Sequence, residues 1–210
     1  MILHGYWRSG AAYRTRIALH LKGLPFDQQG VDLRTGAQKS DAFVALNPQG
    51  MVPALEVDGA VLTQSPAILE WLEEAHPEPP LLPSDPLDRA RVRAMAALIG
   101  CDIHPLNNLR VGKALREGFG ADQAAVDAWA ARWIAPGFQA LEALVADHGV
   151  GWCFGASPTL ADCYLIPQIY SARRFNVPLD AFPRLLAIDA GAAQHPAFSA
   201  AHPDVQPDAD

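Results

Sequence analysis

The sequence predicts a protein of two parts, an α/β domain followed by an all-helical domain. Strand and helix patterns alternate in the order β-α-β-α-β-β-α over roughly the first 75 residues, as in an α/β layer. A proline-rich segment follows, and beyond it apolar residues recur at three- and four-residue steps, the spacing of a helix's buried face. We therefore expect an α/β domain over residues 1–76, a linker over 77–86 and an all-helical domain over 87–210.

The α/β domain begins with a short apolar strand, Met1–Tyr6, which turns through Ser9-Gly10 into a helix over Ala11–Lys22. Two apolar runs joined by Asp58-Gly59 predict a β-hairpin within Met51–Leu62. The other elements expected here are a strand over Phe26–Leu33, a short helix over Ser40–Leu46, and a helix to about Glu74 with Ser65 as its N-cap and Pro66 at its first position.

Prolines predict the linker, and helix-capping residues help to predict the helical half. Residues 76–86, HPEPPLLPSDP, hold five prolines in eleven residues, and such a segment continues neither a helix nor a central strand. Further on, Thr159 and Asp162 form a variant capping box, with Asp in place of Glu. The helix that they open is apolar on nearly all sides, so we expect it at the centre of the bundle. The other features expected are a helix whose buried stripe is Val92, Met95, Ala96, Ile99 and Ile103, a helix over Asp122–Ala146 kinked at Pro136, a last helix over Pro183–Ala193, and a frayed polar tail from His202.

Composition excludes several classes of protein. Half of the residues are hydrophobic, yet no apolar run approaches the roughly 20 residues that span a bilayer, so we expect a soluble globular protein. The net charge of −7 weighs against nucleic acid or an anionic membrane as partner. The N-terminus lacks an export signal, which indicates the cytoplasm. The three cysteines, Cys101, Cys153 and Cys163, form no CxxC pair and are expected as small buried apolar residues, and no residue set has metal-ligand spacing.

Three local features of the α/β domain could together bind one ligand. At Arg8-Ser9 a strand leads into a helix N-terminus, where unpaired N–H groups and the helix dipole attract an anion. Taken alone, this feature is more simply an ordinary strand–helix joint with a surface serine. At Val52-Pro53 a proline precedes a strand, and a cis bond there would expose the backbone of Val52. Gln64-Ser65 opens the next helix as a second anion site. These features suit an extended peptide with a carboxylate at one end and a thiol at the other.

The order of these motifs resembles the glutathione transferase superfamily. The chain carries NPQGMVPAL and QSPAILEWLEE, then a proline-rich linker and an all-helical half with SPTLADCYLIPQ. More narrowly, YWRSGAAYRTRIALHLKGL, CDIHPLNNLRV and PTLADCYLIPQIYSARRF resemble the zeta class, the maleylacetoacetate and maleylpyruvate isomerases. The resemblance covers nearly the whole chain and implies a thioredoxin-like first domain, glutathione as cofactor and a homodimer.

The resemblance also implies roles for individual residues. Ser9 takes the place of the serine that donates a hydrogen bond to the glutathione thiolate. Family motifs often have further hydroxyls or a cysteine after it, whereas this chain has Gly10, Ala11 and Ala12, so Ser9 and the helix N-terminus are left to lower the thiol pKa. The other glutathione contacts implied are Val52 before a cis Pro53 at the cysteinyl part, Gln64 and Ser65 at the γ-glutamyl end, Gln38 and Gln49 at the glycyl end, and Asp102, His104 and Asn108 from the helical domain, where His104 has an ordinary structural alternative.

The activity that the resemblance implies is cis–trans isomerisation of a maleyl keto acid. Such a substrate has two carboxylates and develops enolate charge, so it calls for arginines, and Arg8, Arg110 and Arg174 are the candidates. Arg8 is nearest the thiolate turn and is expected to serve the reacting end. Two alternatives stay open: a transferase that conjugates or dehalogenates small electrophiles at the same site, and a non-catalytic glutathione-binding module, which the alanines at Ala11 and Ala12 favour.

Overall fold

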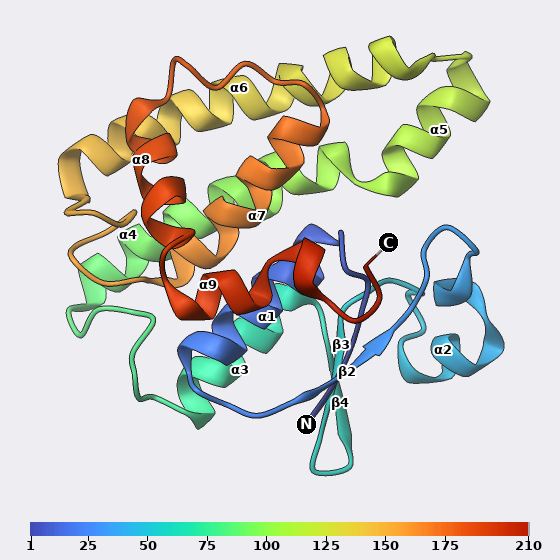
Figure 1. Ribbon diagram of the computed structural model, residues 1–210, viewed down its shortest axis with the longest axis horizontal. Helices are drawn as coiled ribbons and strands as arrows, with labels where there is room; N and C mark the ends of the chain where they lie inside the picture. The colour runs from blue at the N-terminus through green and yellow to red at the C-terminus, as the bar shows by residue number, and fades with distance from the viewer. Residues whose placement is uncertain (210) are drawn as a thin grey trace. The chain divides into compact units, whose positions relative to one another are not determined.

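A computed structural model describes residues 1–209, which form two compact units. The first unit comprises residues 1–81 together with residues 193–209, and the second comprises residues 82–192 (Figure 1). Among residues 1–209, no helix combines the length and the apolar composition that a membrane span requires.

The first unit is built on a mixed four-stranded sheet with strand order β2-β1-β3-β4. Strand β1 (Ile2–Gly5) pairs parallel with β2 (Asp27–Gly30) and antiparallel with β3 (Ala54–Val57), which continues through a hairpin into β4 (Ala60–Thr63). The hairpin is therefore confirmed, and its turn residue Asp58 has the positive φ that an Asp-Gly turn requires. The second strand is shorter than the sequence predicts.

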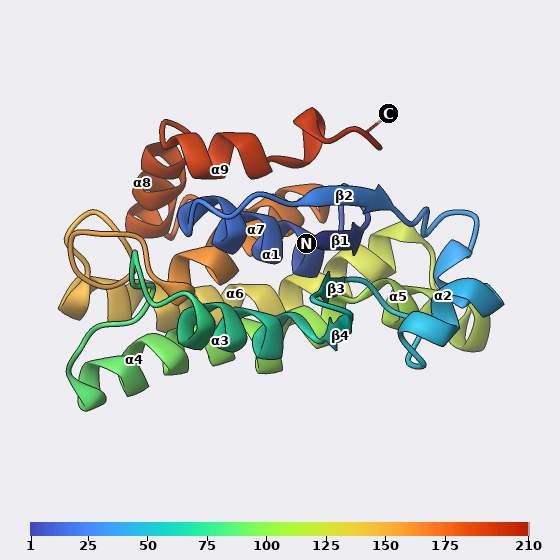
Figure 2. The same ribbon diagram turned by 90° about the horizontal axis from the view of Figure 1, so that it is seen from below.

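Helices cover both faces of this sheet. Helices α1 (Gly10–Leu21) and α3 (Ser65–Ala75) lie on one face, and α2 (Asp41–Leu46) lies on the other (Figures 1 and 2). A short 3₁₀ turn, η1 (Ala37–Lys39), precedes α2. Under α2, the buried side chains of Val31, Phe43 and Ala54 form a small apolar cluster. This arrangement of mixed sheet and helices is the thioredoxin-like architecture that the resemblance implies.

The end of the chain returns to the first unit, which differs from the expected division at residues 87–210. Helix α9 (Pro196–Ala201) packs on α1 and is followed by η4 (Pro203–Val205). The expectation of a frayed tail is wrong. The physical reason is the carboxylate of Asp208, which accepts from the backbone N–H group of Trp7 and from the side chain of Gln28, each at 3.0 Å. The helix before the tail is held as well, because the buried guanidinium of Arg16 donates to the carbonyl oxygens of Ala201 (3.0 Å) and Trp7 (2.9 Å).

The proline-rich segment is held at its start by a buried ion pair of the first unit. Lys22 donates to the Glu73 carboxylate (2.6 Å) and to the Pro79 carbonyl (2.8 Å), and the same carboxylate accepts from the Leu81 N–H group (2.9 Å). The Glu78-Pro79 bond is cis.

The second unit is all helical, as predicted. Its central helix is α7 (Leu160–Arg174), which is buried along almost its whole length and packs against α4, α6 and α8. The predicted stripe Val92, Met95, Ala96, Ile99 and Ile103 is buried, but its last two residues lie in a π-helical turn beyond α4. The elements of this unit are α4 (Pro86–Ala97), η2 (Leu98–Ile103), η3 (His104–Asn107), α5 (Leu109–Phe119), α6 (Gln123–His148), α7 and α8 (Pro183–Ala192).

One helix of this unit and one cysteine depart from the expectations. Helix α5 has no buried residue, so no apolar stripe marked it as part of a core. Its caps did mark it: Asn108 accepts from the Arg110 N–H group (3.1 Å), and Gly120 follows with a positive φ. Cys153 and Cys163 are buried as expected, whereas Cys101 is exposed in the π-helical turn, whose buried residues are Ile99 and Ile103.

Candidate glutathione-type site

The sheet register brings the three predicted features of the first unit to one end of the sheet. Strand β1 runs toward this end, β3 starts from it and β4 returns to it, with His4 opposite Ala54 and Ala54 opposite Thr63. The residues that follow β1, precede β3 and follow β4 therefore lie at the same end of the sheet. These are the Arg8-Ser9 turn, Val52-Pro53 and Gln64-Ser65.

Ser9 is the N-cap of α1. Its backbone is extended (φ −68°, ψ 118°), and its hydroxyl oxygen accepts a hydrogen bond from the Ala12 N–H group at 3.3 Å. Within residues 1–209 the hydroxyl proton of Ser9 donates to no group, so it is available to an anion beside the positive end of the helix dipole. Glycine and alanine at the next two positions add no further hydroxyl.

Arg8 is held by two aromatic side chains. Its guanidinium carbon lies 4.6 Å from the centre of the Trp7 ring, a cation–π contact, and its Nη2 lies 3.4 Å from the Tyr6 hydroxyl. The Nε atom of Arg8 is buried and has no hydrogen-bond partner within residues 1–209. An unpaired buried donor is costly, so this nitrogen is suited to meet an anionic ligand.

The Val52-Pro53 bond is cis, as the resemblance implies. Pro53 is buried, Val52 is half-buried, and β3 begins at the next residue, Ala54. No hydrogen bond to the backbone N–H or C=O group of Val52 occurs within residues 1–209. Val52 therefore presents a free donor and a free acceptor at this end of the sheet, which is what an extended peptide requires for strand-like pairing.

Gln64 has a strained backbone between β4 and α3. Its φ is +66° at ψ 109°, which is rare for a residue with a side chain. Its side-chain amide donates to the Gln49 side chain. Strained residues of this kind cluster at ligand sites, where the surrounding structure holds them in place.

The prediction that Ser65 is the N-cap of α3 is wrong. Gln64 is the N-cap residue and makes no side-chain capping bond, and Ser65 is the first helical residue. The Ser65 hydroxyl instead accepts from the Arg14 guanidinium at 2.9 Å, and both side chains are buried. Sequence reasoning missed Arg14, although an arginine in a helix that is otherwise buried was a signal for a buried partner.

Gln38 and Gln49 approach each other around a glycine. The Gln38 Oε1 atom is buried without a partner among the described residues, and the Gln49 carbonyl accepts from Lys39 Nζ at 3.3 Å. Gly50 has a φ of +60°, and a Cβ atom there would lie 2.9 Å from the Gln38 carbonyl oxygen. Only glycine fits this approach, which keeps Gln38, Lys39 and Gln49 beside one another.

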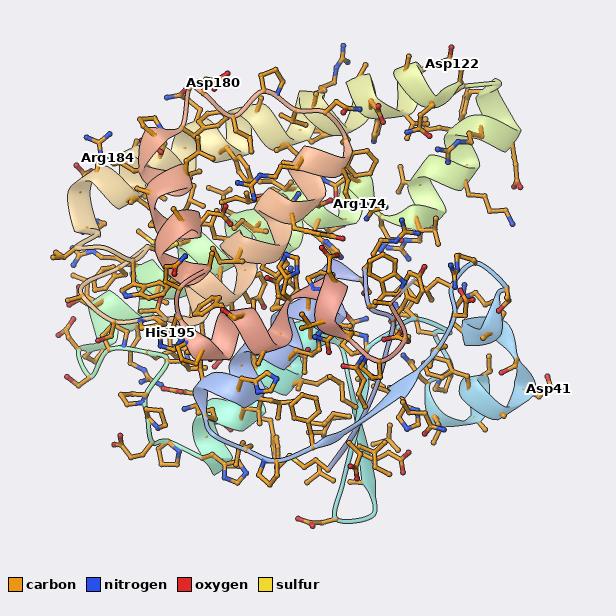
Figure 3. All side chains as sticks on the ribbon, in the orientation of Figure 1. Asp41, Asp122, Arg174, Asp180, Arg184 and His195 are labelled. Carbon is orange, nitrogen blue, oxygen red and sulfur yellow. The ribbon has the colours of Figure 1, made fainter. Side chains whose placement is uncertain are left out.

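The candidates of the second unit lie in two places. Asp102, His104, Asn108 and Arg110 occupy the stretch from η2 to the first turn of α5, where Asp102 and Arg110 are exposed and Asn108 caps α5. Arg174 is the last residue of α7 and is exposed (Figure 3). Its neighbour Arg173 forms an ion pair with Asp189 at 2.6 Å. The ion pair gives Arg173 a structural role within this unit.

Together, the residues of the first unit fit an extended peptide that carries a thiol and a carboxylate. Ser9 offers an O–H donor at a helix N-terminus, Val52 offers free backbone groups beside it, and the α3 N-terminus with Gln64 offers a carboxylate site. The buried Arg8 Nε and Gln38 Oε1 atoms have no hydrogen-bond partner within residues 1–209 and can bind polar groups of a ligand. Among residues 1–209, no three His, Cys, Asp or Glu side chains could hold a metal ion.

Comparison with known proteins gives the family. Two family models match, that of the glutathione S-transferase N-terminal domain over residues 8–75 and that of the C-terminal domain over residues 123–188. A maleylacetoacetate isomerase of Pseudomonas aeruginosa is 54% identical over 211 residues, covering 99% of this chain and 98% of that protein.

Two solved structures are similar over their whole length. One is the holo structure of a maleylpyruvate isomerase, a bacterial glutathione S-transferase of the zeta class, with 53% identity, a TM-score of 0.98 and complete coverage of both chains. The other is a maleylacetoacetate isomerase of Anaeromyxobacter dehalogenans with glutathione bound in its active site, with 47% identity, a TM-score of 0.90, and coverage of 100% of this chain and 97% of that one. On this evidence the chain belongs to the zeta class of the glutathione transferase superfamily.

Proposed function

We propose that this protein is a glutathione-dependent cis–trans isomerase that acts on a maleyl keto acid in the breakdown of aromatic compounds. The observation that carries the proposal is the convergence of the Ser9 hydroxyl, the free backbone of Val52 and the strained Gln64 at one end of the sheet. The similar proteins, which are isomerases of maleylacetoacetate or maleylpyruvate, support the reaction and the substrate class.

Glutathione would bind across this end of the sheet in an extended form. Val52 pairs with its cysteinyl part, Gln64 and Ser65 hold the γ-glutamyl carboxylate at the α3 N-terminus, and Gln38 with Gln49 meets the glycyl end. The unpartnered backbone of Val52 and the unpartnered Gln38 Oε1 support these assignments. Asp102, His104 and Asn108 of the second unit would border the same ligand, although the capping bond of Asn108 already explains that residue.

When bound, glutathione supplies a thiolate that adds to the cis double bond and leaves after the bond has rotated, so that glutathione is not consumed. Ser9 donates its hydroxyl proton to the sulfur, and the α1 N-terminus adds its positive potential, so that both lower the thiol pKa. Arg8 lies in the same turn, and its guanidinium would stabilise the negative charge that develops at the reacting end. Arg110 and Arg174 bind the carboxylates of the keto acid.

The test is to follow the ultraviolet spectra of maleylacetoacetate and of maleylpyruvate with and without glutathione. We expect a fumaryl product at a rate that depends on glutathione, with the total glutathione unchanged. One-for-one loss of glutathione, or release of halide from a small 2-halo acid in place of isomerisation, would indicate a conjugating or dehalogenating transferase. Glutathione binding with no reaction of either keto acid would indicate a non-catalytic module. The faster of the two keto acids identifies the substrate.

We also propose that the protein works as a homodimer in the cytoplasm. The family resemblance supports the dimer, and the three cysteines, which form no disulfide within residues 1–209, support a reducing compartment. Light scattering of the purified protein should give twice the mass of 22.6 kDa. A mass of one chain at assay concentration would contradict the dimer.

A further inference from the structure

The carboxylate of Asp208 joins the end of the chain to the turn that carries Arg8 and Ser9. Its Oδ2 atom accepts from the backbone N–H group of Trp7 at 3.0 Å, and its Oδ1 atom accepts from the side chain of Gln28 at 3.0 Å. Both contacts lie within the first unit. One side chain therefore bridges the segment after β1 and strand β2.

The sheet is shaped to admit this side chain. Gly30 is the last residue of β2, opposite Gly5 of β1, and a Cβ atom at Gly30 would lie 3.1 Å from the Cβ atom of Asp208. A side chain at Gly30 would therefore crowd Asp208. The Trp7 N–H group lies beyond the end of β1, where no neighbouring strand provides an acceptor, so the carboxylate takes the place of a strand partner.

A second contact from the end of the chain reaches the same residue. The Trp7 carbonyl accepts from the Arg16 guanidinium, and that guanidinium also donates to the carbonyl of Ala201, the last residue of α9. Both backbone groups of Trp7 are thus held by the C-terminal segment, one directly and one through Arg16. The Trp7 ring in turn makes the cation–π contact with the Arg8 guanidinium, and Ser9 lies two residues after Trp7 in the chain.

We propose that Asp208 is a positioning residue for Arg8 and Ser9. It fixes the Trp7 backbone, so that the Arg8 guanidinium and the Ser9 hydroxyl are held in the geometry that thiolate activation needs. This inference rests on the proposed function for the chemistry, but the contact itself can be tested without it. Small misplacement of such groups is costly to rate, because catalysis depends on their orientation.

The experiment compares Asp208→Ala and Asp208→Asn with Asp204→Ala in the full chain. Asp204 is the matched control, since it is an exposed carboxylate of the same C-terminal segment that contacts His202 and not the turn. Three quantities are measured for each variant. They are the amide exchange rate of the peptide that contains Trp7, the pKa of the thiol of bound glutathione from its thiolate absorbance, and kcat with KM for isomerisation.

For Asp208→Ala we expect faster amide exchange at Trp7 and a raised pKa of the glutathione thiol. The kcat should fall about tenfold, which is the scale of losing one charge-assisted hydrogen bond, and KM for the keto acid should change less than about twofold. Asp208→Asn keeps an oxygen acceptor for the Trp7 N–H group and should restore most of kcat. Asp204→Ala should match the wild type. A role that is electrostatic only predicts the opposite sign, because removing a nearby anion lowers the thiol pKa in both Asp208 variants.

Two results would overturn the proposal: unchanged exchange at Trp7 in Asp208→Ala, or faster exchange with an unchanged thiol pKa and kcat. If Asp208→Ala does not fold, Gln28→Ala removes the second contact of the carboxylate and should give a smaller change of the same sign. If the wild type binds glutathione but isomerises neither keto acid, the proposed function fails, and the exchange and thiol titration data still decide the role of Asp208.

Discussion

Two serines of the first unit cap helices in the same way, and only one of them lies at the proposed thiol site. Ser9 accepts from the Ala12 N–H group and Ser40 from the Phe43 N–H group, each at 3.3 Å. Replacing either serine with alanine should cost about 1 kcal/mol of unfolding free energy. The pair thus separates the capping role of a serine from its role toward a ligand.

Ser9→Ala should raise the pKa of the bound glutathione thiol by about one unit, because the thiolate loses a hydrogen-bond donor. At neutral pH the turnover should fall about tenfold, and it should recover at higher pH as the thiol ionises. Ser40→Ala should leave the thiol titration and the pH profile as in the wild type. A pH profile of Ser9→Ala that matches the wild type would remove Ser9 from the mechanism.

The neighbouring arginines at the end of α7 form a second matched pair. Arg174→Ala should raise KM for the keto acid about tenfold or more, because a charge-assisted contact to a carboxylate is lost, while kcat changes little. Arg173→Ala breaks an exposed ion pair with Asp189 and should cost less than about 1 kcal/mol of stability, with KM unchanged. Steady-state kinetics and urea unfolding of the two variants test this. Equal effects on KM would contradict the assignment of Arg174.

At the scale of single residues, the sequence predicted which residues lie at the site but not the hydrogen-bond partner of each one. Ser9 and Val52 were found because a strand–helix joint and a proline before a strand are local signals. Ser65 was assigned the wrong role, since its partner Arg14 lies 51 residues earlier in the chain and no local pattern links them. A buried pair between helices depends on tertiary packing, which spacing along one helix does not reveal.

At the scale of elements, Asp162 joins the start of α7 to the preceding loop. Its carboxylate is fully buried and accepts from the backbone N–H groups of Thr159 and Cys153, each at 2.8 Å, and from the Thr159 hydroxyl at 2.9 Å. The predicted capping box is therefore confirmed, and the contact with Cys153 extends it. Burial raises the pKa of the Asp162 carboxyl and outweighs the hydrogen bonds, which lower it.

This raised pKa produces a pH dependence with a defined sign. The folded state binds the proton of Asp162 more tightly than the unfolded chain does. Protonation of Asp162 therefore contributes fully to the free energy of unfolding below the ordinary pKa of about 3.9, and this contribution is lost as the pH rises through the raised pKa. Asp162→Asn has no such titration and loses acceptors, which should cost about 1–3 kcal/mol. We expect the difference in free energy of unfolding between the wild type and Asp162→Asn to become smaller as the pH rises.

Urea unfolding at a series of pH values measures that difference. Asp122→Asn is the control, since Asp122 is an exposed capping residue of α6 that accepts from the Ala125 N–H group at 2.8 Å (Figure 3). It reports the loss of a capping carboxylate without burial. A difference between wild type and Asp162→Asn that widens as pH rises would show that the hydrogen-bond donors outweigh burial and that the carboxyl pKa is lowered in the folded state.

Elements with strong local signals were predicted well, and those without a buried face were not. The Asp58-Gly59 hairpin and the apolar helix α7 carry their structure in adjacent residues. Helix α5 escaped prediction because its apolar residues, among them Leu109 and Phe119, stay exposed. Its caps were the better signal, because capping is satisfied within the helix itself and needs no partner.

At the scale of the whole molecule, the chain leaves the first unit and returns to it. Residues 193–209 were expected in the helical domain because the sequence is continuous with it, yet they belong to the first unit. Their polar end from His202 was expected to fray, but Asp208 accepts from the backbone N–H group of Trp7 and from the side chain of Gln28. Contacts across almost the full length of the chain leave no local signal in the sequence.

Truncation after Ala192 should therefore weaken the first unit selectively. It removes Phe198, which is 2% exposed, and the carbonyl that accepts from Arg16 of α1. Losing a buried phenylalanine alone costs about 3–5 kcal/mol, and the loss of one acceptor of the buried Arg16 guanidinium adds to this. Amide exchange in α1 should accelerate at least about a hundredfold, whereas α6 and α7 of the second unit should keep their protection, because their buried residues pack within that unit. Truncation after Gln206 is the control, since it keeps α9 and the Ala201 carbonyl and removes the contacts of Asp208 and the hydrogen bond from the Ala209 N–H group to the Gln206 carbonyl. Equal loss of protection in both units would contradict this prediction. It would show that residues 193–209 stabilise the whole molecule and not the first unit alone.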